Sequence, residues 1–187
     1  MDYQSFSDEQ LTAEAQTGSQ LAYTALVKRY WDRLVRYVRR MTAGSSEAED
    51  VVQNALVKAW QNLRGFNPDR RFSPWIYRIV HNALVDHLKS RQRDPLPFFD
   101  PDVLFPHPVA PDRADTRADL ALIRRQLDQS LDKLEAKYRE VLVLRYYEAL
   151  SYTEIADVLR LPVGTVGVRI KRALAKLQSF IPPHEHA

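Results

Sequence analysis

The chain has 187 residues and a net charge of +3; 45% of its residues are hydrophobic and none is cysteine. The lack of cysteine excludes disulfide frameworks, thiolate zinc sites and cysteine nucleophiles, and it is compatible with a reducing compartment. No apolar run approaches the roughly 20 residues that span a bilayer. Residues 1–8 are polar and acidic, unlike a signal peptide. We therefore expect a soluble, cytoplasmic protein.

The charge is distributed unevenly along the chain. Counting Lys and Arg against Asp and Glu, residues 1–93 carry +4, residues 94–119 carry −4 and residues 120–187 carry +3. Two basic blocks around an acidic strip suit two modules that face nucleic acid, joined by a segment that phosphates repel. Ordinary solvated charge accounts for these values equally well, so charge alone does not decide.

Apolar residues recur every three or four positions outside residues 94–119, and no clear run alternates at two, which predicts an all-α protein. In the first block an apolar stripe and a basic stripe share one helix, so we expect one core face and one basic face. The apolar stripe is Tyr23, Leu26, Val27, Tyr30, Leu34, Tyr37, Val38 and Met41. The basic stripe is Arg29, Arg33, Arg36 and Arg40.

Start signals place two more helices in the first block. Ser46 with Glu49 three residues later forms a capping-box pattern and predicts a helix to about Leu63. Ser73 followed by Pro74 reads as an N-cap and first helical residue, and opens a helix to about residue 92. The core face expected for that helix is Ile76, Ile79, Val80, Ala83 and Leu88.

The middle segment, residues 94–119, holds six of the 11 prolines and no glycine. Proline cannot continue a helix and restricts the residue before it to extended geometry, so we expect a semi-extended, acidic linker. Its apolar residues predict that parts of it dock on a surface. The expected domains are therefore 1–93 and 120–187, on either side of this linker.

The final block is expected to form helices near 116–133, 136–148, 151–159 and 164–179. Within it, the residues from 151 to 177 have the pattern of a helix-turn-helix. Ser151 and Glu154 make a capping box, and Ala156 is small where the two helices cross. The expected turn, residues 161–164, is short and contains proline. The stripe expected to be buried in the second helix is Val166, Ile170, Leu174 and Leu177.

The second helix of this motif also carries a cationic face. Arg169, Arg172 and Lys176 project together, and such a face can enter a major groove, where arginine reads guanine edges or pairs with phosphate. A plain amphipathic hairpin with solvated cations is the alternative interpretation. The capping box, small crossing residue, short turn and cationic helix together favour DNA binding.

These motifs resemble those of a known family. Residues 138–148 (YREVLVLRYYE), followed by LSYTEIADVL and PVGTV, resemble region 4 of the extracytoplasmic-function (ECF) sigma factors of bacterial RNA polymerase. Residues 49–55 (EDVVQNA) and 58–60 (KAW) resemble region 2.2, and residues 72–83 (FSPWIYRIVHNA) resemble regions 2.3 and 2.4. The resemblance implies two small helical domains, a region 2 bundle and a region 4 helix-turn-helix.

The resemblance also implies roles for residues of the first domain. The region 2.2 helix docks on the clamp coiled coil of the polymerase's largest subunit, and we expect Asp50, Gln53 and Val57, which share one helix face, to make that contact. The loop from Phe66 to Phe72 and the helix after it hold the unpaired strand of the minus-10 element. The residues expected there are Asn67, Asp69, Arg70, Arg71, Trp75, Arg78 and Asn82.

Region 4 reads the minus-35 element as duplex, and here the sequence departs from the family. A common version has Lys-Ser-Arg after Gly-Thr-Val, whereas this chain has Gly167-Val168-Arg169, and Arg160 stands where a turn glycine is frequent. Gly167 inside a helix costs roughly 1 kcal/mol relative to alanine. The expected duplex contacts are Thr165, Arg169, Lys171, Arg172 and Lys176.

The function implied is that of a non-catalytic sigma factor that binds core polymerase and directs initiation at promoters, of stress or envelope-response genes, without cofactor or metal. Its partners would be core RNA polymerase, promoter DNA and an anti-sigma factor. A helix-turn-helix regulator that is not a polymerase subunit is the alternative function, but it leaves the region 2 motifs unexplained. An enzyme would need a site such as metal ligation by His81 and His87, which are six residues apart and poorly aligned on a helix.

Overall fold

A computed structural model describes residues 3–42, 44–91, 127 and 130–180. The chain divides into two compact units, Met1–Leu96 and Pro97–Ala187. All regular elements among the described residues are helical, as the apolar periodicity predicts. The expected linker, 94–119, and most of the helix expected near 116–133 lie outside the described residues. In the described part of the chain, no helix is both long and apolar enough to cross a membrane.

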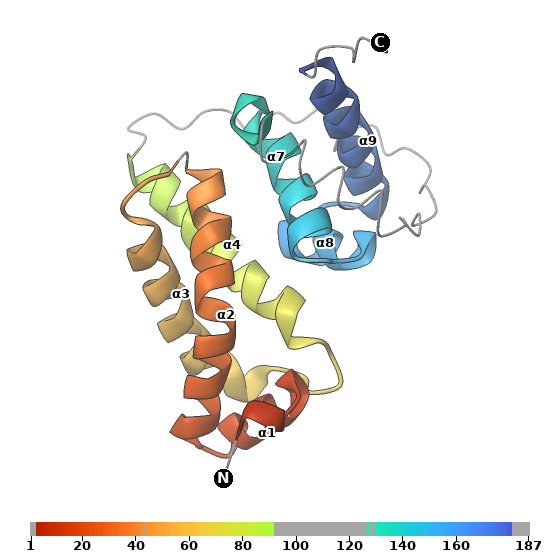
Figure 1. Ribbon diagram of the computed structural model, residues 1–187. Helices are drawn as coiled ribbons and strands as arrows, with labels where there is room; N and C mark the ends of the chain where they lie inside the picture. The colour runs from red at the N-terminus through yellow and green to blue at the C-terminus, as the bar shows by residue number, and fades with distance from the viewer. Residues whose placement is uncertain (1–2, 43, 92–126, 128–129, 181–187) are drawn as a thin grey trace, which may run out of the picture. The chain divides into compact units, whose positions relative to one another are not determined.

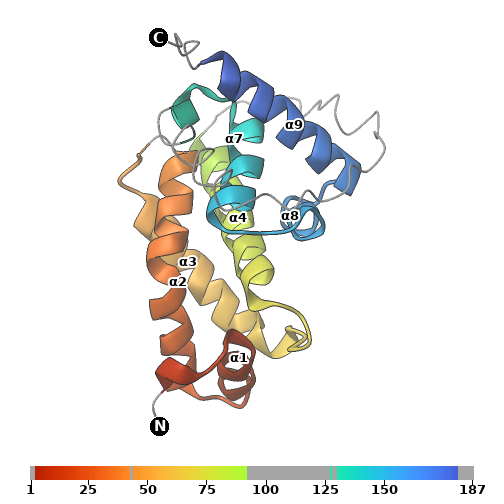
Figure 2. The same cartoon turned by 45° about the vertical axis from the view of Figure 1, so that its right-hand side comes forward.

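The first unit is a helical bundle (Figures 1 and 2). Its helices are α1 (Asp8–Gln16), α2 (Gln20–Met41), α3 (Ala48–Asn62) and α4 (Phe72–Arg91), with 3-10 turns η1 (Tyr3–Ser5) and η2 (Leu63–Gly65). Helix α3 packs on both α2 and α4, while the short α1 lies against one end of α2 and also contacts η2 and α4. Helix α1 therefore touches the segment that leads from α3 into α4.

Aromatic side chains fill the centre of this bundle. The rings of Tyr37 on α2 and Tyr77 on α4 meet edge to face with centroids 5.4 Å apart, and both side chains are fully buried. Tyr30 and Phe72 repeat this contact at 5.3 Å. Each such pair contributes about 1 kcal/mol beyond the area it buries, so two aromatic pairs hold α4 against α2. Leu88, expected in the core, is instead 39% exposed.

Local caps begin the first two helices. Ser7 and Gln10 form a reciprocal capping box at the start of α1. Gly18 adopts φ +103°, a left-handed conformation that suits glycine, and so allows the sharp turn from α1 into α2. Ser19 then accepts a hydrogen bond from the Ala22 amide and caps α2.

Two of the helix starts expected from the sequence are wrong in detail. Helix α3 begins at Ala48 without a side-chain cap: its N-cap is Glu47, so Ser46 lies one residue too early for a capping box, and Glu49 pairs with Arg39 at 2.7 Å. Helix α4 begins at Phe72, so Ser73 lies inside its first turn. Pro74 is tolerated there because the first four amides of a helix have no intrahelical acceptor.

The second unit carries the helix-turn-helix. Its elements are η3 (Leu131–Lys133), α7 (Ala136–Leu142), the π-helical turn η4 (Val143–Tyr147), α8 (Tyr152–Leu159) and α9 (Val163–Ser179). Helix α9 packs on both α7 and α8 (Figure 1). The helix expected over 136–148 therefore exists as α7 continued by one π-helical turn.

Candidate functional site

The loop between η2 and α4 presents polar side chains to solvent. Asn67, Asp69, Arg70 and Arg71 are all exposed, as a nucleic-acid-binding loop requires. The loop is nevertheless ordered by its own hydrogen bonds: the Asp69 amide donates to Asn67 Oδ1 at 2.9 Å, and the Arg70 amide donates to the Asn67 carbonyl at 3.1 Å. Asn67 thus forms an Asx turn, which occupies its side-chain oxygen and leaves its side-chain nitrogen as a donor.

Aromatic rings anchor the loop at both ends. Phe66, which precedes it, and Phe72, which follows it, are both buried, with ring centroids 6.0 Å apart. Trp75 packs on both, at 5.0 Å from Phe66 and 5.5 Å from Phe72, and is half-buried. Part of the Trp75 ring is therefore engaged with the fold. Arg78 and Asn82, one and two turns further along α4, are also half-buried.

A residue that the sequence did not single out contacts the base of this loop. Gln16, the last residue of α1, donates through Nε2 to the Leu63 carbonyl at 2.9 Å and to the Phe66 carbonyl at 2.7 Å. These partners lie 47 and 50 residues later in the chain. Such a contact leaves no periodic signal in the sequence, which is why pattern reasoning does not find it.

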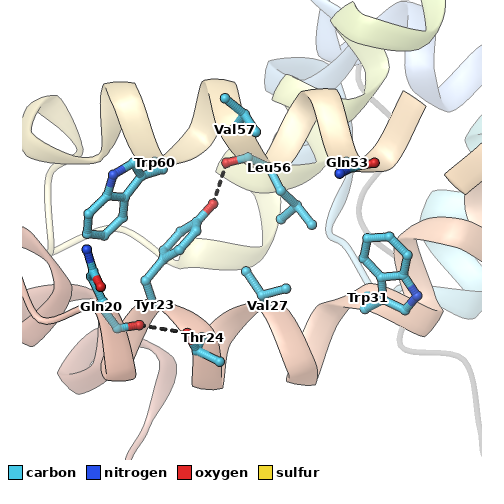
Figure 3. Close-up of a pocket in the computed structure, with 9 residues that line it drawn as sticks. All are labelled: Gln20, Tyr23, Thr24, Val27, Trp31, Gln53, Leu56, Val57 and Trp60. Atoms are coloured by element: carbon cyan, nitrogen blue, oxygen red, sulfur yellow. Dashed lines mark hydrogen bonds between the residues drawn. The ribbon is translucent and has the colours of Figure 1, made fainter. Parts of the chain in front are cut away.

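The residues expected to bind polymerase lie on the outer face of α3. Asp50, Gln53 and Val57 are all exposed, and Val57, at 53% exposure, is one of the few large exposed hydrophobic residues in the described chain. Gln53 and Val57 border an open groove of about 440 Å³ between α2 and α3 (Figure 3). The remaining lining residues are Gln20, Tyr23, Thr24, Val27, Trp31, Leu56 and Trp60.

The groove has a fixed aromatic wall. The Tyr23 hydroxyl donates to the Leu56 carbonyl at 2.6 Å, and its ring tilts against Trp60 with centroids 4.9 Å apart (Figure 3). Burial raises the pKa of the Tyr23 hydroxyl well above its ordinary value. The side chain is thus a neutral donor at any physiological pH, and the groove is lined by uncharged residues throughout.

The helix-turn-helix of the second unit forms as expected at its first helix. Ser151 Oγ accepts from the Glu154 amide at 3.3 Å, and Glu154 accepts from the Ser151 amide at 2.8 Å, so the capping box is confirmed. Helix α8 ends at Leu159 as expected, but the turn covers residues 160–162 instead of 161–164, and Arg160 adopts a left-handed conformation with φ 54°. Arginine therefore occupies a position that glycine would fill at lower cost.

Helix α9 divides the five residues expected to contact duplex DNA into two groups. Thr165 is completely buried and Arg169 is only 5% exposed, so neither presents its side chain to solvent. Burial also lowers the pKa of the Arg169 guanidinium. Lys171, Arg172 and Lys176 are exposed.

Helix α9 packs on both α7 and α8, and its buried residues cover more of its circumference than the apolar stripe alone predicts, because Thr165 and Arg169 are buried beside that stripe. Ala173 is fully buried, and Leu174, expected in the stripe, is only half-buried.

Two local interactions bear on the remaining charged candidates. Lys176 Nζ lies 3.2 Å from Glu135 Oε1 and 5.3 Å from the centroid of the Tyr138 ring, so this lysine also ties the end of α9 to the start of α7. His87, considered as a metal ligand, pairs with Glu47 at 2.7 Å. Among the described residues, no group of three or more His, Asp or Glu side chains is placed to hold a metal ion.

Comparison with known families and proteins matches both units. Residues 26–94 match the family Sigma-70 region 2, and residues 124–177 match Sigma-70, region 4. The chain is 34% identical over 185 residues to RNA polymerase sigma-H factor of Pseudomonas aeruginosa, covering 94% of each chain. It is 33% identical over 176 residues to ECF RNA polymerase sigma factor SigW of Bacillus subtilis, covering 88% of this chain and 91% of that protein.

A solved structure agrees with these relatives. The structure of CnrH in complex with the cytosolic domain of CnrY is 34% identical to this chain. The similarity covers 92% of this chain and 96% of CnrH, with a TM-score of 0.66. The likeness therefore extends over both units and is not confined to the helix-turn-helix.

Proposed function

This chain belongs to the ECF sigma factors of the sigma-70 family, non-catalytic subunits that direct promoter recognition by RNA polymerase, and from that premise we propose which of its surfaces meet polymerase and DNA. The two matched regions explain both basic blocks of the sequence. A helix-turn-helix regulator that is not a polymerase subunit would account for residues 124–177 alone.

We propose that α3 and the groove beside it bind core polymerase. The observation that carries this proposal is the exposure of Val57 at the edge of an uncharged, aromatic-walled groove. The groove follows α2 from Gln20 to Trp31, which is about 16 Å at the rise of an α-helix. That length suits about three turns of an amphipathic helix lying in the groove, and the clamp coiled coil of the polymerase supplies helices. Gln53 gives a polar contact in the groove, and the exposed Asp50 gives another one turn earlier on α3.

The loop of residues 67–71 and the exposed side of α4 are proposed to hold the unpaired strand of the minus-10 element. Exposed arginines can neutralise its phosphates, and Asn67 keeps a donor for a base edge. Trp75, Arg78 and Asn82 are half-buried, so each has part of its side chain available to DNA. The Asp69 carboxylate can accept a hydrogen bond from the exocyclic amine of a base, whereas a phosphate would repel it.

For the minus-35 element, we propose contacts from Lys171, Arg172 and Lys176. These are the exposed cations of α9 among the expected contacts, and exposed cations supply phosphate binding and guanine readout. Thr165 and Arg169 are also among the five residues expected to contact duplex DNA, but their burial favours a role in positioning α9. Arg169 would reach DNA only if its side chain left the fold.

We propose domains of 1–93 and 120–187 with an acidic linker between them, a cytoplasmic location, and control of stress or envelope-response genes. An anti-sigma factor is proposed as the inhibitor that covers the polymerase-binding surface. CnrH, the solved relative, binds the cytosolic domain of a second protein.

Run-off transcription tests these assignments. Core polymerase with this protein, on a pool of promoter fragments from its own genome, should initiate selectively and reveal the promoter. Initiation should fall on Asp50→Ala plus Gln53→Ala, and also on Val57→Asp, which puts a charge at the groove edge. Lys58→Gln is the matched control: it lies on the same helix, and its exposed ion pair with Asp86 at 3.8 Å is worth little. Equal losses in all three variants would refute a contact specific to the groove.

A further inference from the structure

Helix α1 holds the loop expected to bind the minus-10 strand through one side chain. Gln16 Nε2 donates to the Leu63 carbonyl at 2.9 Å and to the Phe66 carbonyl at 2.7 Å, and Phe66 is the residue directly before the exposed loop. A side-chain amide nitrogen carries two donors, so both are used here. The Leu63 carbonyl also accepts the Phe66 amide at 3.0 Å. One side chain thus fixes both ends of η2.

The opposite side of the loop base is held by rings. The Phe66 side chain packs on Phe72 and Trp75, which lie at the start of α4. The backbone carbonyl of Phe66 is therefore bound by Gln16, while the Phe66 ring packs on residues of α4. Rotation of the Phe66 peptide would break the 2.7 Å bond and redirect Asn67, the first residue of the loop.

Gln16 can do this because α1 is itself fixed. Leu11 and Thr12 are completely buried and Ala15 is 3% exposed, so one side of α1 is part of the core. At its other end, Asp8 binds Arg29 and Tyr30 of α2. Gln16 itself is only half-buried, so replacing it leaves no large cavity in the core. This helix lies outside the match to Sigma-70 region 2, which begins at residue 26.

We propose that Gln16 is a positioning residue for minus-10 recognition: it sets the conformation of the loop of residues 67–71 without touching DNA. The proposal rests on the proposed function of that loop. It assigns α1 a part in strand capture, since a loop that is ordered beforehand loses less conformational entropy when it binds. Loosening the loop base should therefore weaken binding of the single strand and leave binding to polymerase unchanged.

The test compares two ligands of the same unit. Affinity is measured for a single-stranded oligonucleotide carrying the minus-10 element found by run-off transcription, and separately for core polymerase. Gln16→Ala should weaken oligonucleotide binding about tenfold with polymerase binding and the unfolding temperature nearly unchanged. Trypsin should also cleave faster after Arg70 and Arg71. Glu14→Ala is the control on the same helix, because removing a negative charge should not weaken DNA binding.

A conservative variant separates positioning from general stability. Gln16→Glu places a carboxylate against two carbonyl oxygens at neutral pH, so it should weaken oligonucleotide binding at least as much as Gln16→Ala. Protonation at acidic pH restores one donor, so affinity relative to the unsubstituted protein should recover on acidification for Gln16→Glu but not for Gln16→Ala. A purely structural loss of a side chain would give no such recovery.

The outcomes distinguish this inference from the function on which it rests. Arg70→Ala plus Arg71→Ala tests the loop directly. If that variant loses oligonucleotide binding and Gln16→Ala does not, the loop function stands and the role of Gln16 is refuted. If neither variant loses binding, the proposed loop function fails, and the role of Gln16 fails with it. Parallel losses of oligonucleotide binding, polymerase binding and unfolding temperature in Gln16→Ala would show general destabilisation and also overturn the proposal.

Discussion

The Tyr30 hydroxyl on α2 donates a hydrogen bond to the Asp8 carboxylate, at the first residue of α1. The other oxygen of the same carboxylate accepts from Arg29 Nη1 at 2.5 Å, and Arg29 Nη2 also donates to the Phe6 carbonyl at 2.9 Å. Two adjacent residues of α2 therefore bind one carboxylate of α1. Because Asp8 lies at the helix N-terminus, its charge is also favourable to the helix dipole.

Replacing Asp8 should detach this end of α1. We expect Asp8→Ala to lower the free energy of unfolding of the first unit by about 2 kcal/mol, because Tyr30, 2% exposed, loses its charged acceptor. Urea unfolding followed by tryptophan fluorescence measures this unit selectively, since all three tryptophans lie between residues 31 and 75. Glu9→Ala, an exposed acid one residue later, is the control and should cost less than half as much.

The same contact predicts a loss of stability at high pH. Burial, and then the Asp8 carboxylate, raise the pKa of Tyr30 well above the ordinary tyrosine value. A raised pKa means that the folded state holds the phenol proton more tightly than the unfolded chain does. Its contribution is therefore complete below about pH 10, the unfolded value, and is lost as pH rises above it.

This loss of stability at alkaline pH should be measurable as the slope of unfolding free energy against pH. Tyr30 alone accounts for about 1.4 kcal/mol of unfolding free energy per pH unit above pH 10. Urea midpoints between pH 8 and about 11.5 should fall less steeply in Tyr30→Phe, which cannot ionise there. Parallel curves for the two proteins would contradict a raised pKa at this residue.

The sequence predicted the start of the helix-turn-helix correctly, but it did not predict which faces of the second helix, α9, are buried. The capping box of Ser151 and Glu154 depends on residues three apart, and it forms as expected. The same pattern at Ser46 does not form, because α3 has Glu47 as its N-cap, and Glu49 pairs with Arg39 of another helix. Helical periodicity in α9 indicates one buried stripe, whereas Arg169, outside that stripe, is buried as well. Sequence periodicity reports the spacing of residues and not the number of neighbours that a helix will have.

For the candidate DNA-binding loop as well, part of the site could be predicted from the sequence and part could not. Its exposed charges, including Arg70 and Arg71, could be recognised from the sequence because they follow a motif of the family. The support from Gln16 could not, since its partners are backbone carbonyls 47 and 50 residues away, and any residue type supplies a carbonyl. Side-chain to backbone contacts across helices are thus outside the reach of motif reasoning.

The turn of the helix-turn-helix carries a removable strain. Arg160 has φ 54° and ψ 47°, a left-handed conformation that costs a residue with a Cβ roughly 1 kcal/mol. Arg160→Gly should stabilise the second unit by about 0.5 kcal/mol, the remainder being offset by the greater freedom of glycine in the unfolded chain. Thermal unfolding of the intact protein by circular dichroism measures the effect. Arg160→Ala keeps the Cβ, so a similar gain in that variant would assign the effect to the charge instead.

The buried and exposed cations of α9 should differ in how their replacement changes the salt dependence of DNA binding. Each phosphate contact that a cation makes to duplex DNA contributes about 0.9 to the slope of log K against log salt concentration. Lys171→Ala should reduce that slope by about one on a minus-35 duplex, because Lys171 is exposed. Arg169→Met keeps most of the side-chain volume in its 5% exposed site and should leave the slope unchanged while altering thermal stability. If Arg169→Met lowers the slope as much as Lys171→Ala does, Arg169 must leave its buried site and reach the phosphates when DNA binds.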